Sequence, residues 1–159
     1  MQAQIRPYQP QDEEAVIALS LRAWAPPHES MEQVMGREIF VRLHGDWREH
    51  QEDDVRRTLS EEGMHVWVAE VEQRVVAFAA ARLQHQKVGE IYMLAVDPEH
   101  HNKGVGTALT DVATAWLAHS GMRVAMVETG GDPGHAPGRR VYEKAGYTLM
   151  PIARYFKAL

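Results

Sequence analysis

Residues 90–106 read EIYMLAVDPEHHNKGVG, a largely apolar run that stops at Asp97-Pro98 and passes into a loop with two glycines. The apolar run is typical of a buried strand. Gly104 and Gly106 stand where a helix with apolar residues at helical spacing begins, so backbone N–H groups and the positive end of a helix dipole meet there. With Lys103 beside them, these residues predict an anion site suited to a pyrophosphate. The same glycines would also serve a simple turn.

The rest of the chain is organised around this stretch without an internal repeat or a linker, so we expect one domain over residues 1–159. The patterns predict strands over 5–8, 66–71, 75–83, 90–96 and 123–129, with a closing pair of strands over 147–150 and 152–158. They predict helices over 12–21, 105–118 and 137–146, and one or two more within 28–62. Trp24-Ala25-Pro26-Pro27 predicts a break after the first helix. This order is typical of a mixed α/β sheet.

Composition narrows the function classes. Hydrophobic residues make up 45% of the chain and charged residues 25%, as in folded globular proteins. The longest apolar run, Val75 to Ala81, is too short to span a membrane, so we expect no membrane partner. The formal net charge of −5 argues against a nucleic-acid partner. The chain has no cysteine, which is consistent with a reducing compartment, and we expect a cytoplasmic protein.

A second block lies downstream of the glycine loop, where residues 142–147 read YEKAGY. Together with the strand and the HNKGVG loop of residues 101–106, it resembles the two signature blocks of the GNAT superfamily of N-acetyltransferases, in the same order. His101 stands where that family usually has Gln or Arg. His135 stands where an Asn often precedes the second block by seven residues. The resemblance implies an α/β (α+β) fold with a mixed, mostly antiparallel central sheet flanked by helices.

The resemblance also implies acetyl-CoA as co-substrate and direct transfer of the acetyl group to an amine. The free backbone groups of the strand before the loop would then pair with the pantetheine arm, and the loop would bind the pyrophosphate. The residues implied for cofactor binding are Leu94, Ala95, Val96, His101, Asn102, Lys103, Gly104, Val105, Gly106 and Thr107.

The catalytic roles fall on two residues. Tyr142 is expected to protonate the departing thiolate, because a phenol can supply a proton to a thiolate whose conjugate acid has a pKa of about 8.5. Glu90, predicted by strand alternation to share a face with Tyr92 and Leu94, is the candidate base that deprotonates the attacking ammonium. Glu128 competes for that role, and ordered water alone remains an alternative. A packed core tyrosine and a solvated carboxylate are the simpler interpretations.

The acceptor side is expected to involve Trp24, Glu128 and His135. His135 precedes the Tyr142 helix and could orient substrate or act as a base, since imidazole titrates near neutral pH, although a solvated loop histidine is the simpler interpretation. Segment 29–62 holds ten acidic and five basic residues, and with Trp24 it would form an acidic, aromatic rim that attracts a cationic amine. A solvated helical face is the alternative. The histidines show no metal spacing, so we expect no metal.

These features predict an N-acetyltransferase that acts on a primary amine, most simply a small cationic molecule. An acetyltransferase of protein N-termini or lysines would use the same chemistry on a peptide amine. A non-catalytic acyl-CoA-binding sensor is the alternative from another class. The family resemblance also implies a homodimer paired through the C-terminal strands.

Overall fold

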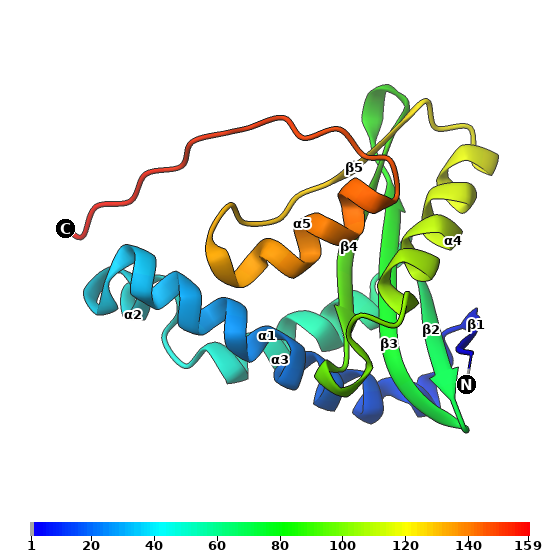
Figure 1. The fold of residues 1–159 in the computed structure, drawn as a ribbon, viewed down its shortest axis with the longest axis horizontal. Helices are drawn as coiled ribbons and strands as arrows, with labels where there is room; N and C mark the ends of the chain where they lie inside the picture. The colour runs from blue at the N-terminus through cyan, green and yellow to red at the C-terminus, as the bar shows by residue number, and fades with distance from the viewer. Residues whose placement is uncertain (1) are drawn as a thin grey trace.

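The computed structural model describes residues 2–159. Five strands form one sheet in the order β1-β2-β3-β4-β5, with antiparallel pairs from β1 to β4 and a parallel β4–β5 pair (Figure 1). The strands are β1 (Gln4–Pro7), β2 (His65–Val71), β3 (Arg74–Leu83), β4 (Val88–Val96) and β5 (Val124–Val127), and the α-helices are α1 (Glu13–Met35), α2 (Arg37–His44), α3 (Trp47–Ser60), α4 (Val105–His119) and α5 (Ala136–Lys144). The mixed sheet that the sequence pattern predicts is confirmed, and so is the mostly antiparallel arrangement flanked by helices that the family resemblance implies.

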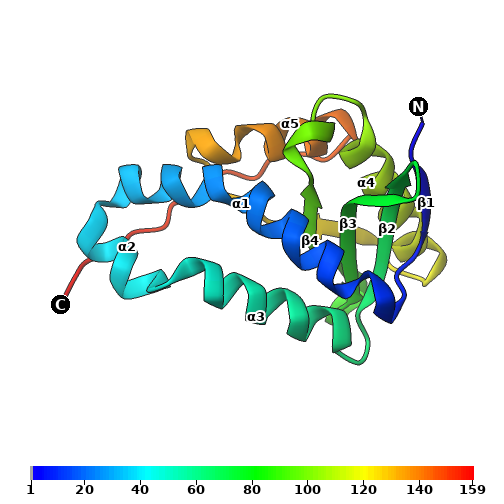
Figure 2. The same cartoon turned by 90° about the horizontal axis from the view of Figure 1, so that it is seen from below.

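Strand β3 lies at the centre of the sheet and is buried on both faces, which explains its unbroken run of apolar residues. On one face, α4 contributes Leu109, Ala113 and Leu117 to the core. On the other face, α1 and α3 pack against Phe78 and its neighbours, and Figure 2 shows these two helices lying side by side. The helices therefore cover both faces of the sheet. The place where β4 and β5 adjoin stays available for a site.

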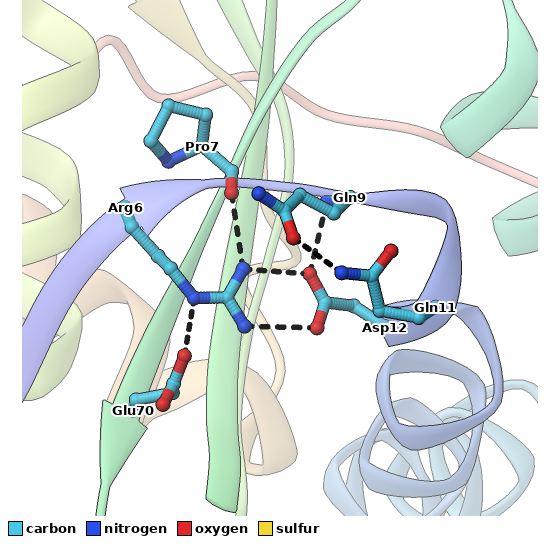
Figure 3. Close-up of polar contacts among 6 residues, drawn as sticks. All are labelled: Arg6, Pro7, Gln9, Gln11, Asp12 and Glu70. Carbon is cyan, nitrogen blue, oxygen red and sulfur yellow. Dashed lines mark hydrogen bonds and ion pairs between the residues drawn. The ribbon is translucent and has the colours of Figure 1, made fainter. Parts of the chain in front are cut away.

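The start of α1 is fastened to the sheet by Arg6 on β1 (Figure 3). The Arg6 guanidinium donates to both oxygens of Asp12, at 2.8 and 2.9 Å, and also binds Glu70 on β2. The hydrogen bonds from Arg6 hold the pKa of the nearly buried Asp12 carboxyl below its usual value. Asp12 is the residue predicted to cap the first helix, but its side chain makes no cap hydrogen bond to α1 and binds Arg6 instead.

Helix α1 runs through Pro26 and Pro27 to Met35, so the predicted break after the first helix is wrong. Proline removes an intrahelical hydrogen bond and normally ends or kinks a helix. Here tertiary contacts hold the chain on both sides of the prolines. The Trp24 and Phe78 rings pack edge-on with their centroids 6.2 Å apart. The Ser30 hydroxyl donates a hydrogen bond to the Asp132 carboxylate at 2.5 Å.

The closing pair of strands predicted after residue 146 is also wrong for the single chain. Among the described residues, no strand follows β5, and residues 148–159 leave the sheet and run toward α2 (Figure 1). The apolar side chains of this tail are largely exposed: Leu149, Met150, Ile152, Tyr155, Phe156 and Leu159. At its end, Arg42 on α2 binds the backbone oxygen of Leu159. The alternation that predicts a strand is present, but a strand needs a partner, and here the tail has none.

Candidate active site

Strand β5 pairs along its whole length, but only with the first residues of β4, from Val88 to Ile91. Beyond that point a bulge at Tyr92 interrupts the β3–β4 register, and the last residues of β4 have no β5 partner. A cavity of about 760 Å³ opens at this place, within the range of small-molecule sites. Its lining falls into two walls with α5 closing the end. The β4–α4 wall is formed by residues within 94–107, and the α1–loop wall by residues of 23–27 together with Gly134 and His135.

The bulge decides on which face of the sheet Glu90 lies. Leu94 pairs with Ala79 and belongs to the core under α4, whereas Glu90 pairs with Arg82 and lies on the opposite face. The prediction that Glu90 shares a face with Leu94 is therefore wrong, because the extra residue in the bulge reverses the alternation. The Glu90 carboxylate binds Arg82 at 2.8 Å and Gln84 at 2.7 Å, and Glu90 does not line the cavity. Its role as a base stays a prediction.

The loop between β4 and α4 has the geometry of an anion site. Gly104 precedes the first helical residue with φ +80°, a left-handed conformation that favours glycine. The N-terminus of α4, with its unpaired N–H groups, borders the cavity. A Cβ at Gly106 would lie 3.4 Å from Val96 and from Val141, so at this glycine the start of α4 packs closely against the end of β4 and against α5.

The cofactor residues predicted from sequence are almost all in this wall. Leu94, Ala95, Val96, His101, Asn102, Gly104, Val105, Gly106 and Thr107 line the cavity, and Lys103 does not. The His101 imidazole forms a hydrogen bond with the Val96 carbonyl at 2.9 Å through Nε2. This bond fastens the loop to the end of β4, a role for His101 that its sequence position does not predict.

Tyr142 lies on α5 and lines the same cavity. Burial raises the pKa of its phenol, and the neighbouring Tyr147 adds to the effect, so the group stays protonated at neutral pH. The two rings lie 6.1 Å apart, and the Tyr147 hydroxyl in turn forms a 2.5 Å hydrogen bond with Thr114 on α4. Tyr142 is thus a protonated phenol in the cavity lining, and Tyr147, itself bonded to α4, is next to it.

The three residues predicted for the acceptor side separate in the structure. Trp24 and His135 line the cavity. Glu128 follows β5 outside the cavity lining, and its exposed carboxylate lies 3.4 Å from Arg154 of the tail. The cavity therefore unites Trp24 and His135 but not Glu128.

The acidic segment does not line the cavity either. Several of its carboxylates pair with arginines of the same segment: Glu32 with Arg37, Glu38 with Arg42, Glu52 with Arg56 and Asp54 with Arg57. Its aromatic residues surround His28 instead of the cavity, with Trp47 stacked on the imidazole at 4.2 Å and Phe40 edge-on at 6.2 Å. Burial lowers the pKa of His28. Most of this segment consists of helices that carry ion pairs and do not contact the cavity. This is close to the simpler interpretation of its charge, a solvated helical face.

Three residues near the cavity have no place in the sequence predictions. Arg140 is in the lining, and Ser30 and Asp132 hold His135 from behind. The Asp132-Pro133-Gly134 sequence is typical of a turn in which the aspartate side chain binds backbone N–H, and Asp132 does accept from Gly134 at 3.2 Å. No local pattern indicates Ser30, because its partner is 102 residues away.

Among residues 2–159, no helix is long and apolar enough to cross a membrane, and no group of three or more His, Asp or Glu side chains is arranged to hold a metal ion.

Comparison with known proteins agrees with this architecture. The chain is 28% identical to the mycothiol acetyltransferase of Amycolatopsis mediterranei over 148 residues, which covers 87% of this chain and 43% of that protein. It is 25% identical to the enzyme of the same name from Pseudarthrobacter chlorophenolicus over 150 residues, 91% of this chain and 42% of that protein. The chain thus spans less than half the length of these relatives.

Solved structures share the fold. The PaiA N-acetyltransferase of Thermoplasma acidophilum, solved in complex with coenzyme A, superposes with a TM-score of 0.70 at 17% identity, over 96% of this chain and 94% of that one. An aminoglycoside 6'-N-acetyltransferase of Acinetobacter haemolyticus gives 0.70 at 15% identity, over 98% of both chains. The acetyltransferase (GNAT) family profile matches residues 29–147, well over half of the sequence. The chain belongs to the acetyltransferase (GNAT) family.

Proposed function

We propose that residues 1–159 form one acetyltransferase domain that moves an acetyl group from acetyl-CoA directly to a primary amine. The supporting observation is the cavity itself, where the end of β4 that has no β5 partner, the glycine loop at the start of α4 and the protonated Tyr142 meet. Coenzyme A is bound in the solved Thermoplasma relative. The chain has no cysteine to form a thioester intermediate, which favours direct transfer.

The β4–α4 wall fits a pyrophosphate-bearing thioester. Gly104 has open space where a Cβ would lie, so phosphate oxygens can approach the backbone there. Leu94, Ala95 and Val96 pair with β3 but have no strand neighbour on the β5 side, where the Val96 carbonyl already bonds to His101. The other backbone groups on that side would pair with an extended pantetheine arm, and the residues within 101–107 would lie at its anionic end. Arg140 and Lys144 on α5 add positive charge to the lining.

Tyr142 is proposed as the acid of the reaction. When the amine nitrogen bonds to the thioester carbon, the C–S bond breaks and its electron pair goes to sulfur. The Tyr142 hydroxyl forms no hydrogen bond within the described part of the chain, so its proton is free to pass to that sulfur. Loss of a positioned acid typically costs 10²–10⁴-fold in rate.

The acceptor is proposed to be a small cationic amine. The relatives named above include mycothiol and aminoglycoside acetyltransferases, and the cavity walls at Trp24 and His135 enclose a site of small-molecule size. The acidic residues of segment 29–62 that form no ion pair would attract the cationic amine at long range and would not contact it in the cavity. An acetyltransferase of protein N-termini or lysines, and an acyl-CoA-binding sensor, remain the alternatives.

The test is release of coenzyme A thiol from acetyl-CoA, read with a thiol-reactive dye over polyamines, aminoglycosides, amino acids and short peptides. The chain itself contributes no thiol background. Release with one amine class establishes transfer and names the acceptor. Binding of acetyl-CoA by calorimetry without release over the whole panel favours the sensor. No binding overturns the placement of the pyrophosphate loop.

A homodimer and a cytoplasmic location remain part of the proposal. The observation that supports a dimer is the exposed apolar tail beyond Tyr147. Light scattering after size exclusion measures it directly, and a monomer at all concentrations would contradict it.

A further inference from the structure

Two side chains, Asp132 and Ser30, support the imidazole of His135 from behind the α1–loop wall. His135 Nδ1 lies 2.5 Å from Asp132 Oδ1, and Ser30 on α1 donates to the other carboxylate oxygen at 2.5 Å. The Gly134 N–H donates to Ser30 Oγ at 2.9 Å and closes the arrangement. Asp132 and His135 side chains are 11% and 19% exposed, so the pair is largely shielded from water.

Two glycines leave the room that this arrangement needs. A Cβ at Gly130 would collide with the Asp132 carboxylate and the His135 ring, and a Cβ at Gly134 would collide with Ser30. Arg139 on α5 fixes the same loop by donating to the Gly130 carbonyl at 2.6 Å and the Asp132 carbonyl at 2.8 Å. The imidazole, its carboxylate partner and the serine are therefore held from α1, the loop and α5 at once.

The hydrogen bonds set the tautomer of the ring. Burial acts to raise the pKa of Asp132, but the hydrogen bond from Ser30 and the charge and hydrogen bond of His135 outweigh it, so the net pKa is lowered and the group is a carboxylate. A carboxylate at Nδ1 places the ring proton on that nitrogen and leaves the Nε2 lone pair free. Within residues 2–159 Nε2 makes no hydrogen bond, and His135 lines the cavity.

The charged and titratable groups around the ring are few. Asp132 belongs to its own loop, His28 faces it from α1, and Arg139 and Arg140 are on α5. Tyr142 follows His135 by seven residues: His135 directly precedes α5, Tyr142 lies on α5, and both line the cavity. The two side chains therefore border the same cavity, as a base for the amine and an acid for the departing thiolate require.

We propose that His135 Nε2 is the proton acceptor for the attacking amine, with Asp132 and Ser30 as positioning residues. This inference rests on the proposed transferase function and replaces Glu90 as the base. The ammonium gives one proton to Nε2 and becomes a neutral amine. Its nitrogen bonds to the thioester carbon, the C–S bond breaks, and sulfur takes the electron pair and a proton from Tyr142. The second nitrogen proton leaves as the amide forms and restores the phenol, and the imidazolium releases its proton to water.

The experiment compares His135→Asn with Glu90→Gln, using acetyl-CoA and the amine that the parent acetylates fastest. We expect His135→Asn to lower kcat/KM at pH 7 by about 10²-fold, the usual loss for a positioned base. Its rate should rise with pH as the amine itself deprotonates, without the imidazole-type limb of the parent profile. Acetyl-CoA affinity by calorimetry should be unchanged. His85→Asn, an exposed histidine in the β3–β4 connection, is the matched control and should match the parent.

Asp132→Asn and Ser30→Ala extend the test to the positioning residues. Both should lower kcat while thermal unfolding shows a folded protein, and Asp132→Asn should shift the acidic limb of the profile because the ring loses its carboxylate. An unchanged pH profile in His135→Asn, or a loss found only in Glu90→Gln, would overturn the inference and leave the transferase intact. A parent that releases no thiol with any amine would overturn the transferase first and the proton acceptor with it.

Discussion

The two walls of the cavity differ in how they are built. The β4–α4 wall comes from one continuous stretch within residues 94–107, shaped by a bulge, a left-handed glycine and the start of a helix. The α1–loop wall is assembled by contacts such as that between Ser30 and Asp132, 102 residues apart. The wall made from local geometry is the one proposed to bind the pyrophosphate. The α1–loop wall depends on side-chain contacts between distant segments, so the backbone constrains it less. We therefore expect differences in the preferred acceptor to arise from this wall.

The largest expected effect lies where the two walls meet, at α5. Tyr142→Phe should lower kcat by about 10²–10⁴-fold, because the thiolate loses its proton donor. Acetyl-CoA affinity should stay near the parent value, since the ring and its packing remain. Steady-state kinetics and calorimetry measure the two quantities. Tyr155→Phe, on the exposed tail, is the control, and an unchanged kcat in Tyr142→Phe would remove the acid from the mechanism.

The next largest effect is expected on stability, at the contact that holds the start of α1 against the sheet. Asp12→Asn should lower the free energy of unfolding by about 1.5–3 kcal/mol at pH 7, because the buried hydrogen bonds to charged Arg6 are weakened. The folded-state pKa of Asp12 is below its ordinary value of 3.8. Its stabilisation is therefore present above that value and lost as pH falls through the lowered pKa.

Urea unfolding of parent and Asp12→Asn at neutral and acidic pH measures this directly. The two proteins should approach one another in stability as the pH falls below about 4, the ordinary range of an aspartate. A constant difference across the whole range would contradict the assignment of the pH effect to Asp12.

A smaller effect tests the β4–α4 wall alone. Gly104→Val places a β-branched residue at φ +80° and brings its side chain toward the proposed phosphate. The backbone strain of about 1–2 kcal/mol corresponds to roughly 5–30-fold weaker acetyl-CoA binding if it is relieved by moving the loop. Gly121→Val is the matched control, with φ +88° and open space but no place in the cavity. It should lose stability and keep its affinity.

The smallest effect is expected in the acidic cover. Asp54 and Arg57 form an exposed pair one turn apart on α3. Asp54→Asn should change the free energy of unfolding by less than about 0.5 kcal/mol, since exposed pairs contribute little. A large loss would mean that the ion pairs of this segment stabilise the fold, in contrast to the solvent-screened role inferred for them. Added salt should likewise leave the parent's stability nearly unchanged.

Part of the fold and of the site follows from local pattern. The central strands, α4, α5 and the glycine loop were predictable because each depends on neighbours in the sequence, and Gly146, with φ +88°, ends α5 in a left-handed conformation as its position predicts. The glycine loop and Tyr142 could be assigned together because both belong to contiguous blocks.

Other features depended on contacts that no window of sequence contains. Pro26-Pro27 predicted a break, but contacts at Trp24 and Ser30 keep α1 helical. The alternation after Tyr147 predicted strands, but strands form only where an edge accepts them. The bulge at Tyr92 places Glu90 and Leu94 on opposite faces of the sheet. It could not be predicted from β4 alone, because a bulge depends on how β3 and β4 pair. Backbone propensity and turn chemistry are encoded locally, whereas the environment of His135 exists only after residues 30 and 132 are brought together by folding.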